Sequence, residues 1–135
     1  MATVTKQTVI DIPPSAVWDA LRDWGALHKR LAPGFVTDLR LEEGDRVITM
    51  FNGAVVRERL VAVDEHARRL VWSIIDGPYA HHNASAQILP NETDKARFVW
   101  TADFLPNELA ARIDAFMERG LKTIKDTLEA ASTNG

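Results

Sequence analysis

The chain has 135 residues, 46% of them hydrophobic, with no cysteine and a formal net charge of −3 at pH 7. This length suits one domain around one core, and the acidic balance argues against a protein that binds a nucleic-acid backbone. Without cysteine, the chain has no disulfide, thiolate nucleophile or zinc–thiolate site.

The first strand is predicted at residues 3–12, where two prolines end it. Residues 15–24 follow as a short helix, because apolar side chains recur at helical spacing after a proline and a serine. Gly25 interrupts this helix, and residues 26–31 are predicted to form a second short one.

Six further strands are predicted in a row, joined mainly by tight turns. They cover residues 35–41, 46–51, 54–64, 69–75, 79–89 and 95–104. Asn52-Gly53 is the strongest turn signal, and a two-residue turn there would place Val47 opposite Glu58. Consecutive strands joined by hairpins indicate an antiparallel sheet.

The last segment changes its period. After Pro106, apolar residues recur at spacings of three and four, which predicts a helix of roughly 20 residues with one apolar face. That face consists of Leu109, Ile113, Phe116, Met117, Gly120, Leu121, Ile124 and Leu128. A helix of this length can cover the sheet, so the order of elements predicts an α+β fold.

Glu58 is the most informative residue of the predicted sheet. It shares one alternating row with Val56, Leu60 and Ala62, although a carboxylate is costly to bury among apolar groups. We therefore interpret the row as the wall of a cavity. The neighbouring arginines belong to the opposite face, so a partner for Glu58 must come from another element. The alternative is a structural glutamate bonded to a buried water or to an arginine.

Several motifs resemble one known family and occur in its order over nearly the whole chain. They are Ile12-Pro13-Pro14-Ser15-Ala16-Val17-Trp18, Leu21-Arg22-Asp23-Trp24, Arg57-Glu58-Arg59-Leu60 with Asp64, Trp72-Ser73-Ile74-Ile75-Asp76-Gly77, Gln87-Ile88-Leu89-Pro90 and Trp100. On these residues, the chain resembles the polyketide cyclase/dehydrase-like branch of the SRPBCC, or START-like, superfamily. The resemblance implies a helix-grip fold: a curved seven-stranded antiparallel sheet wrapped around a long C-terminal helix, with two short helices after strand 1.

The resemblance also implies a single START-like ligand-binding domain at residues 1–131, with 132–135 as a frayed tail. A cavity between sheet and helix would take a small hydrophobic ligand, with Glu58 on the cavity side. Plant abscisic-acid receptors, which look similar, have a longer gate loop where this chain has Asn52-Gly53, so we do not expect a hormone-gated switch. Some relatives cyclise polyketides and others only carry or sense ligands, so the fold leaves the activity open.

His82 is the second candidate for chemistry, because it shares an apolar row with Ala84 in its predicted strand. The ligand contacts that we predict are Thr49, Phe51, Glu58, Leu60, Trp72, Ile74, His82, Ala84, Phe98, Trp100, Arg112, Phe116 and Gly120. The competing interpretation is ordinary core packing for the aromatic residues, and solvent exposure for His82 and Arg112.

Two functions compete on this basis. The first is a protein that binds or carries a small hydrophobic ligand. The second is a cyclase/dehydratase-type enzyme without a cofactor, in which Glu58 and His82 act as acid and base and must therefore face one common void. A third option is an interaction protein that uses the outer face of the sheet.

The outer face carries its own expectation. If Glu58 points inward, Ile48, Met50, Val55 and Val61 should point outward, which is more apolar than a solvated face needs. A homodimer through this face would explain them.

Other classes of site find no support in the sequence. The four histidines lack the spacing of a metal site, and neither a glycine-rich phosphate loop nor a serine nucleophile elbow occurs. We expect no metal, no cofactor and no nucleic-acid partner. The first residues lack a signal-peptide pattern, and no apolar run approaches the ~20 residues of a membrane span, so we expect a cytoplasmic protein.

Overall fold

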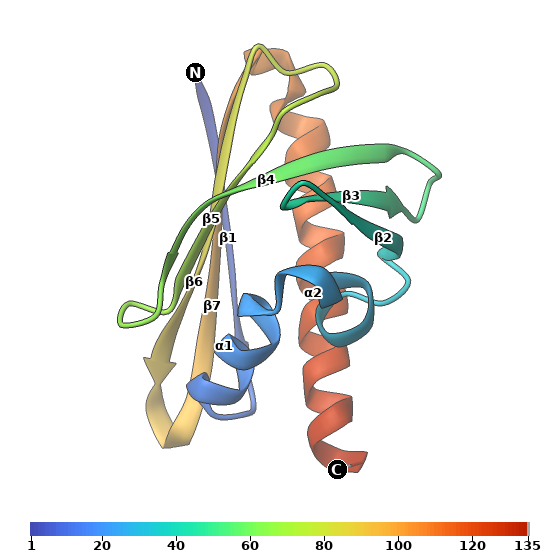
Figure 1. Cartoon of the computed structure of the whole chain (residues 1–135). Coiled ribbons are helices and arrows are strands. Elements are labelled where there is room, and N and C mark those ends of the chain that lie inside the picture. Colours follow the sequence, from blue (N-terminus) through green and yellow to red (C-terminus); the bar gives the residue numbers. More distant parts are fainter. Residues whose placement is uncertain (135) are drawn as a thin grey trace.

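One antiparallel sheet of seven strands, in the order β1-β7-β6-β5-β4-β3-β2, dominates the computed structural model, which describes residues 1–134. Its strands are β1 (Ala2–Ile10), β2 (Val36–Glu42), β3 (Asp45–Met50), β4 (Val55–Asp64), β5 (Arg69–Ile74), β6 (His81–Asn91) and β7 (Lys95–Leu105). The sheet curves past the long helix α2 (Ala110–Asn134) (Figure 1). The predicted helix-grip fold is confirmed.

The short helices follow β1, as predicted. Helix α1 (Pro14–Arg22) starts on a proline, whose missing N–H and fixed φ suit a first turn. A 3₁₀ turn, η1 (Trp24–Ala26), and a π turn, η2 (Leu27–Leu31), form the second piece, and η2 contacts both β2 and α2. Two further 3₁₀ turns, η3 (Glu92–Asp94) and η4 (Asn107–Leu109), flank β7. Of the predicted tail, Gly135 lies outside the described residues.

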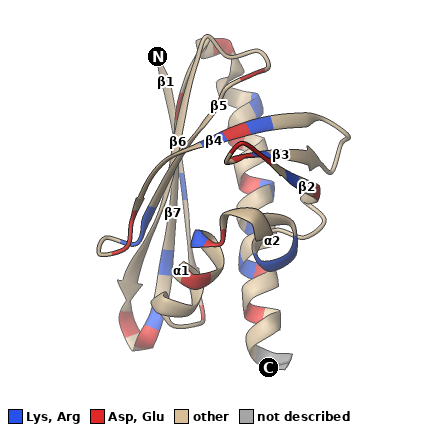
Figure 2. Cartoon of the chain, in the orientation of Figure 1, with Lys and Arg blue, Asp and Glu red and all other residues tan. Residues whose placement is uncertain are grey.

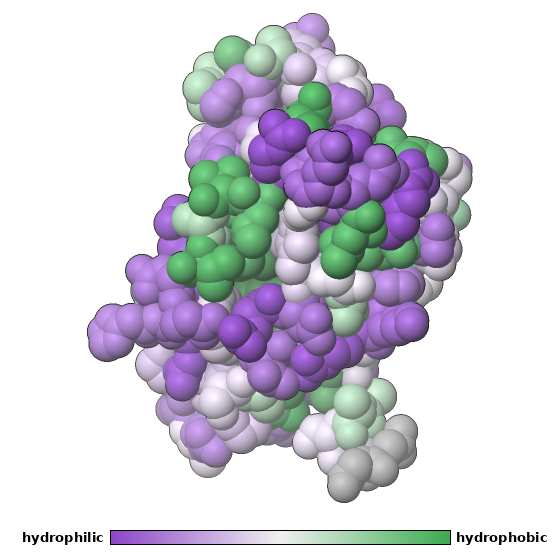
Figure 3. Space-filling view, viewed as in Figure 1, coloured by the Kyte–Doolittle hydropathy of each residue, from purple (hydrophilic) through white to green (hydrophobic). Residues whose placement is uncertain are grey.

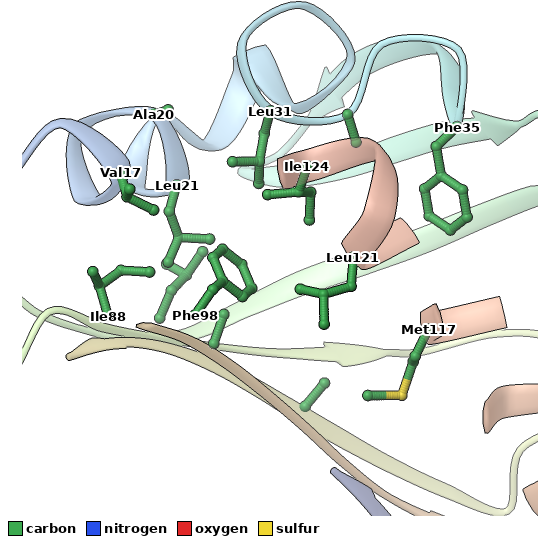
Figure 4. Close-up of a cluster of buried hydrophobic side chains, with 14 of the residues drawn as sticks. Val17, Ala20, Leu21, Leu31, Phe35, Ile88, Phe98, Met117, Leu121 and Ile124 are labelled. Carbon is green, nitrogen blue, oxygen red and sulfur yellow. The ribbon is translucent and has the colours of Figure 1, made fainter. Parts of the chain in front are cut away.

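The core fills the space between the helices and the sheet. Figure 4 shows side chains of α1 and α2, with Leu31 of η2, converging on Ile88 and Phe98 of the sheet. On α2, the predicted apolar face is buried at Met117, Leu121, Ile124 and Leu128. Each buried apolar side chain contributes about 1.5–3 kcal/mol, so this face fixes α2 against the sheet.

The predicted register of the β3–β4 hairpin is wrong by one residue. Glu58 pairs with Arg46, not with Val47. The turn contains three residues instead of two, because Met50 N–H donates to the carbonyl oxygen of Ala54 (2.8 Å) and Gly53 N–H donates to that of Met50 (2.9 Å). Gly53 has φ +86°, the left-handed conformation that glycine adopts at no steric cost.

This register also corrects the predicted outer face. Ile48 and Met50 point inward with Glu58 and are 3% exposed, whereas Val55 and Val61 are more than half exposed, at 58% and 56%. The homodimer hypothesis therefore loses two of its four residues. A hydrophobic area remains over the second half of β4, where Val61 and Val63 are exposed (Figure 3).

A cluster of charged side chains lies on the outer face of the same strands. Asp45 bonds to Arg59 (3.0 Å) and to Arg57 (2.7 Å), and these arginines hold the pKa of Asp45 at about 2. In Figure 2 the acidic β2–β3 turn lies beside the charged stretch of β4. Because the cluster occupies Arg57 and Arg59 on the outside, Glu58 must find its partner on the inside.

None of the helices within residues 1–134 combines the length and the hydrophobicity that a membrane-spanning helix needs.

Candidate functional site

A cavity of about 260 Å³ lies between the concave face of the sheet, η2 and α2. This volume is close to the lower end of the range for small-molecule sites, about 300–1,000 Å³. Most of its walls are apolar, with Ile48, Trp72, Phe98 and Trp100 from the sheet and Ile113 and Phe116 from α2. The cavity therefore fits a small and largely hydrophobic molecule.

Seven of the predicted contacts lie in the cavity wall, namely Glu58, Trp72, Ile74, Phe98, Trp100, Arg112 and Phe116. Six do not: Thr49, Phe51, Leu60, His82, Ala84 and Gly120. The three-residue turn places Thr49 on the outer face of β3, opposite Val55. Leu60 precedes a bulge in β4 and is 37% exposed, and Ala84 belongs to the solid core.

Phe51 and Gly120 act one layer behind the wall. The Phe51 ring stacks on Phe35 at 5.6 Å and lies 6.2 Å from Phe116, measured between ring centroids. A Cβ atom on Gly120 would come within 2.9 Å of the Phe35 ring and 3.0 Å of Trp100. Gly120 thus lets α2 approach the aromatic rings that shape the cavity.

Gly120→Ala is expected to lower the free energy of unfolding by about 1–2 kcal/mol, although alanine favours a helix by about 1 kcal/mol, because overpacking costs about 1–3 kcal/mol. Urea unfolding checks this. Ala115→Gly, at an exposed position of α2, measures the propensity of the same helix and should cost about 1 kcal/mol. A Gly120→Ala variant that is more stable than the wild type would contradict this prediction, because it would mean that the Phe35 and Trp100 rings shift to make room for the added Cβ.

His82 is buried but does not line the cavity. Its Nδ1 accepts a hydrogen bond from the backbone N–H of Ile74 (2.9 Å), and its carbonyl oxygen accepts one from the Ser73 hydroxyl. The β5–β6 pairing ends at Trp72, so the imidazole supplies an acceptor where the ladder stops. Burial lowers the pKa of His82 to about 4, with a smaller contribution from His81. Glu58 and His82 therefore do not share the common void that the acid–base hypothesis required.

Glu58 forms a buried ion pair with Arg46 of the neighbouring strand, at 2.7 Å between Oε1 and Nε. The two residues are 7% and 4% exposed, and both line the cavity. Arg46 was missed from the sequence because the two-residue turn put Val47 opposite Glu58. The alternating row Arg46, Ile48 and Met50 is the signal that could have revealed it.

Two indole rings hold the Arg46 guanidinium in place. Its carbon lies 3.7 Å from the centroid of Trp24 and 5.8 Å from that of Trp72, within the range of cation–π contacts. Nη1 also donates to the carbonyl oxygen of Trp24 (3.3 Å), and Trp24 Nε1 donates to that of Gly44 (3.0 Å). Burial lowers the pKa of Arg46, and Glu58 opposes that shift. The result is a fixed pair of charges in an apolar wall.

Arg112, Tyr79 and Asp76 add polar groups to the cavity lining. Arg112 is exposed and forms no salt bridge with a carboxylate among the described residues. Burial raises the pKa of Tyr79, while Arg112 acts against that rise. The Tyr79 ring packs edge-on against His82 at 4.9 Å between centroids. Among residues 1–134, no group of three or more His, Cys, Asp or Glu side chains is placed to hold a metal ion.

Comparisons with known proteins agree with this architecture. The sequence model of the family described as polyketide cyclase / dehydrase and lipid transport matches residues 1–132. Among curated proteins, none matches the chain.

Solved structures share the fold at low sequence identity. An uncharacterised protein from Bacillus thuringiensis superposes with a TM-score of 0.84 at 20% identity, covering 94% of this chain and 98% of its own. The di-domain ARO/CYC protein BexL superposes with a TM-score of 0.82 at 16% identity, covering 96% of this chain and 47% of its own. Norcoclaurine synthase from Thalictrum flavum superposes with a TM-score of 0.76 at 15% identity, covering 98% of this chain and 87% of its own. At such identities these similarities establish the fold alone.

Proposed function

The chain belongs to the polyketide cyclase/dehydrase and lipid transport family, and we propose from that premise that it binds and carries a small hydrophobic molecule in its cavity. The cavity itself is the observation that carries the proposal. Its apolar walls come from both sheet and helix, and close packing normally fills such a space with side chains. A void of this size beneath a well-packed core favours a ligand site.

The charges of the cavity favour binding over catalysis. Arg46 already bonds the Glu58 carboxylate, and His82 uses its Nδ1 to support the backbone of β5. General acid–base catalysis needs a group within hydrogen-bond reach of the proton that it moves. Because His82 lies outside the cavity wall, the cyclase/dehydratase alternative lacks the second member of its proposed pair.

A blocked cavity tests the proposal. Ile113 lines the cavity from α2, so Ile113→Trp should fill part of the void. With 2-methoxynaphthalene as a fluorescent probe, wild-type protein should bind saturably, and the variant should bind at least about tenfold more weakly. Val63→Trp adds the same ring at an exposed position outside the cavity and should bind as wild type does.

Two outcomes would contradict the proposal: no saturable binding by the wild type, or equal affinity in Ile113→Trp and Val63→Trp. Circular dichroism of both variants checks that each is folded. Native mass spectrometry of protein purified from its own host should then show a co-purified small molecule, whose mass identifies the ligand.

A further inference from the structure

The buried ion pair in the cavity wall keeps unused hydrogen-bonding capacity on both of its partners. Glu58 Oε1 accepts from Arg46 Nε, whereas Oε2 has no hydrogen-bond partner within residues 1–134. Arg46 uses Nε and Nη1, whereas Nη2 has no hydrogen-bond partner in the same part of the chain. Both residues line the cavity, as do the polar side chains of Arg112, Tyr79 and Asp76, and Oε2 and Nη2 belong to the buried pair that is already held in place.

The two groups are preorganised. Arg46 is fixed by Glu58, by the carbonyl oxygen of Trp24 and by the indole faces of Trp24 and Trp72. Its ion pair with Glu58 fixes the carboxylate in turn. A binding site whose polar groups are already in position loses little freedom when it binds, and so it discriminates well between ligands.

The chemistry of the pair selects the ligand group. A carboxylate oxygen only accepts hydrogen bonds and a guanidinium only donates them, whereas a hydroxyl does both. An ether or ketone would satisfy Arg46 alone, and a carboxylate ligand would meet the negative charge of Glu58. Trp72, Trp100, Phe98 and Phe116 supply flat apolar surfaces in the same cavity wall.

We propose that the ligand is a hydroxylated aromatic compound, whose hydroxyl group donates to Glu58 Oε2 and accepts from Arg46 Nη2. The inference rests on the proposed function, because it names the class of molecule that the same cavity takes. It assigns the buried ion pair to ligand selection, in addition to its place in the fold.

Three naphthalene probes test this assignment at pH 7. They share one ring system: 2-naphthol has a donor and an acceptor, 2-methoxynaphthalene only an acceptor, and 2-naphthoate a negative charge. The wild type should bind 2-naphthol at least about tenfold more tightly than 2-methoxynaphthalene, as expected for a lost hydrogen bond to a charged group.

A charge-free cavity provides the matched variant. The double variant Arg46→Met with Glu58→Leu removes the donor and the acceptor together, and the ratio of the two dissociation constants should fall to about one. The control Lys122→Met with Asp126→Leu removes an exposed ion pair on α2, at 2.8 Å, and should keep the wild-type ratio.

The outcomes separate the two proposals. If both neutral probes bind with equal affinity, and Ile113→Trp weakens both, the hydroxyl assignment is wrong while the carrier function stands. If 2-naphthoate binds most tightly, the hydroxyl assignment is also wrong, and the cavity instead recognises an anion through Arg112. If the double variant keeps the preference for 2-naphthol, the ion pair is not the selecting group. Binding of none of the probes would overturn the proposed function itself.

Discussion

Replacing Glu58 by leucine alone should lower the free energy of unfolding by about 3–5 kcal/mol, because it leaves a buried charge without its partner. Arg46 is 4% exposed and cannot reach solvent without moving Trp24, which covers its guanidinium. Arg46→Met should cost a similar amount, since it strands the carboxylate instead. Urea denaturation followed by tryptophan fluorescence and circular dichroism measures both.

The double variant Arg46→Met with Glu58→Leu is expected to unfold within about 1–2 kcal/mol of the wild type, because apolar residues of similar volume often replace a buried ion pair without loss. The two single changes should therefore be strongly non-additive. A double variant as unstable as the sum of the singles would mean that each residue stabilises the fold through its own separate contacts. The exposed pair Lys122–Asp126 supplies the comparison, because removing it should cost less than about 1 kcal/mol.

The order and type of the elements could be predicted from the sequence because its periods are clear, whereas the helix-grip arrangement was implied by the resemblance to a known family. The alternation of apolar and polar residues in β6 and β7 predicted which side chains face the core. Ala84 with Ala86, and Phe98 with Phe104, are indeed buried. The change to helical spacing after Pro106 located α2 in the same way. These patterns depend on local spacing alone, so no knowledge of the partner strand was needed.

The site was harder to predict, since it depends on which residues face each other across strands. Asn52-Gly53 signals a hairpin but leaves the length of the turn open, and one extra residue reverses which side chains face inward. That single residue turned Thr49 outward and brought Arg46 to Glu58. The bond between His82 and the Ile74 backbone arises where the β5–β6 ladder ends, and the alternation of side chains carries no sign of that ending.

His82 should make the stability of the protein depend on pH. Its pKa is about 4 in the folded chain, against the ordinary histidine value of 6.5 in an unfolded chain. The unfolded chain therefore binds more protons between these values, so the stabilisation is complete above pH 6.5 and falls as the pH drops toward 4. The loss should reach up to about 3 kcal/mol. The main cause is burial of the imidazole, which disfavours its charged form. A protonated Nδ1 also can no longer accept the N–H of Ile74.

Urea unfolding at a series of pH values measures this effect. His82→Asn keeps a side-chain acceptor near Ile74 but does not titrate, so the difference between it and the wild type should shrink with falling pH. His81 and Asp103 are the charged neighbours that influence His82, and His81→Asn, at an exposed position, should keep the wild-type slope. Asp45 cannot produce the same signal, because its pKa of about 2 confines its loss to pH values below 3.8. Parallel curves for wild type and His82→Asn between pH 6.5 and 4 would show that His82 leaves the interior, or gains a new partner, once it is protonated.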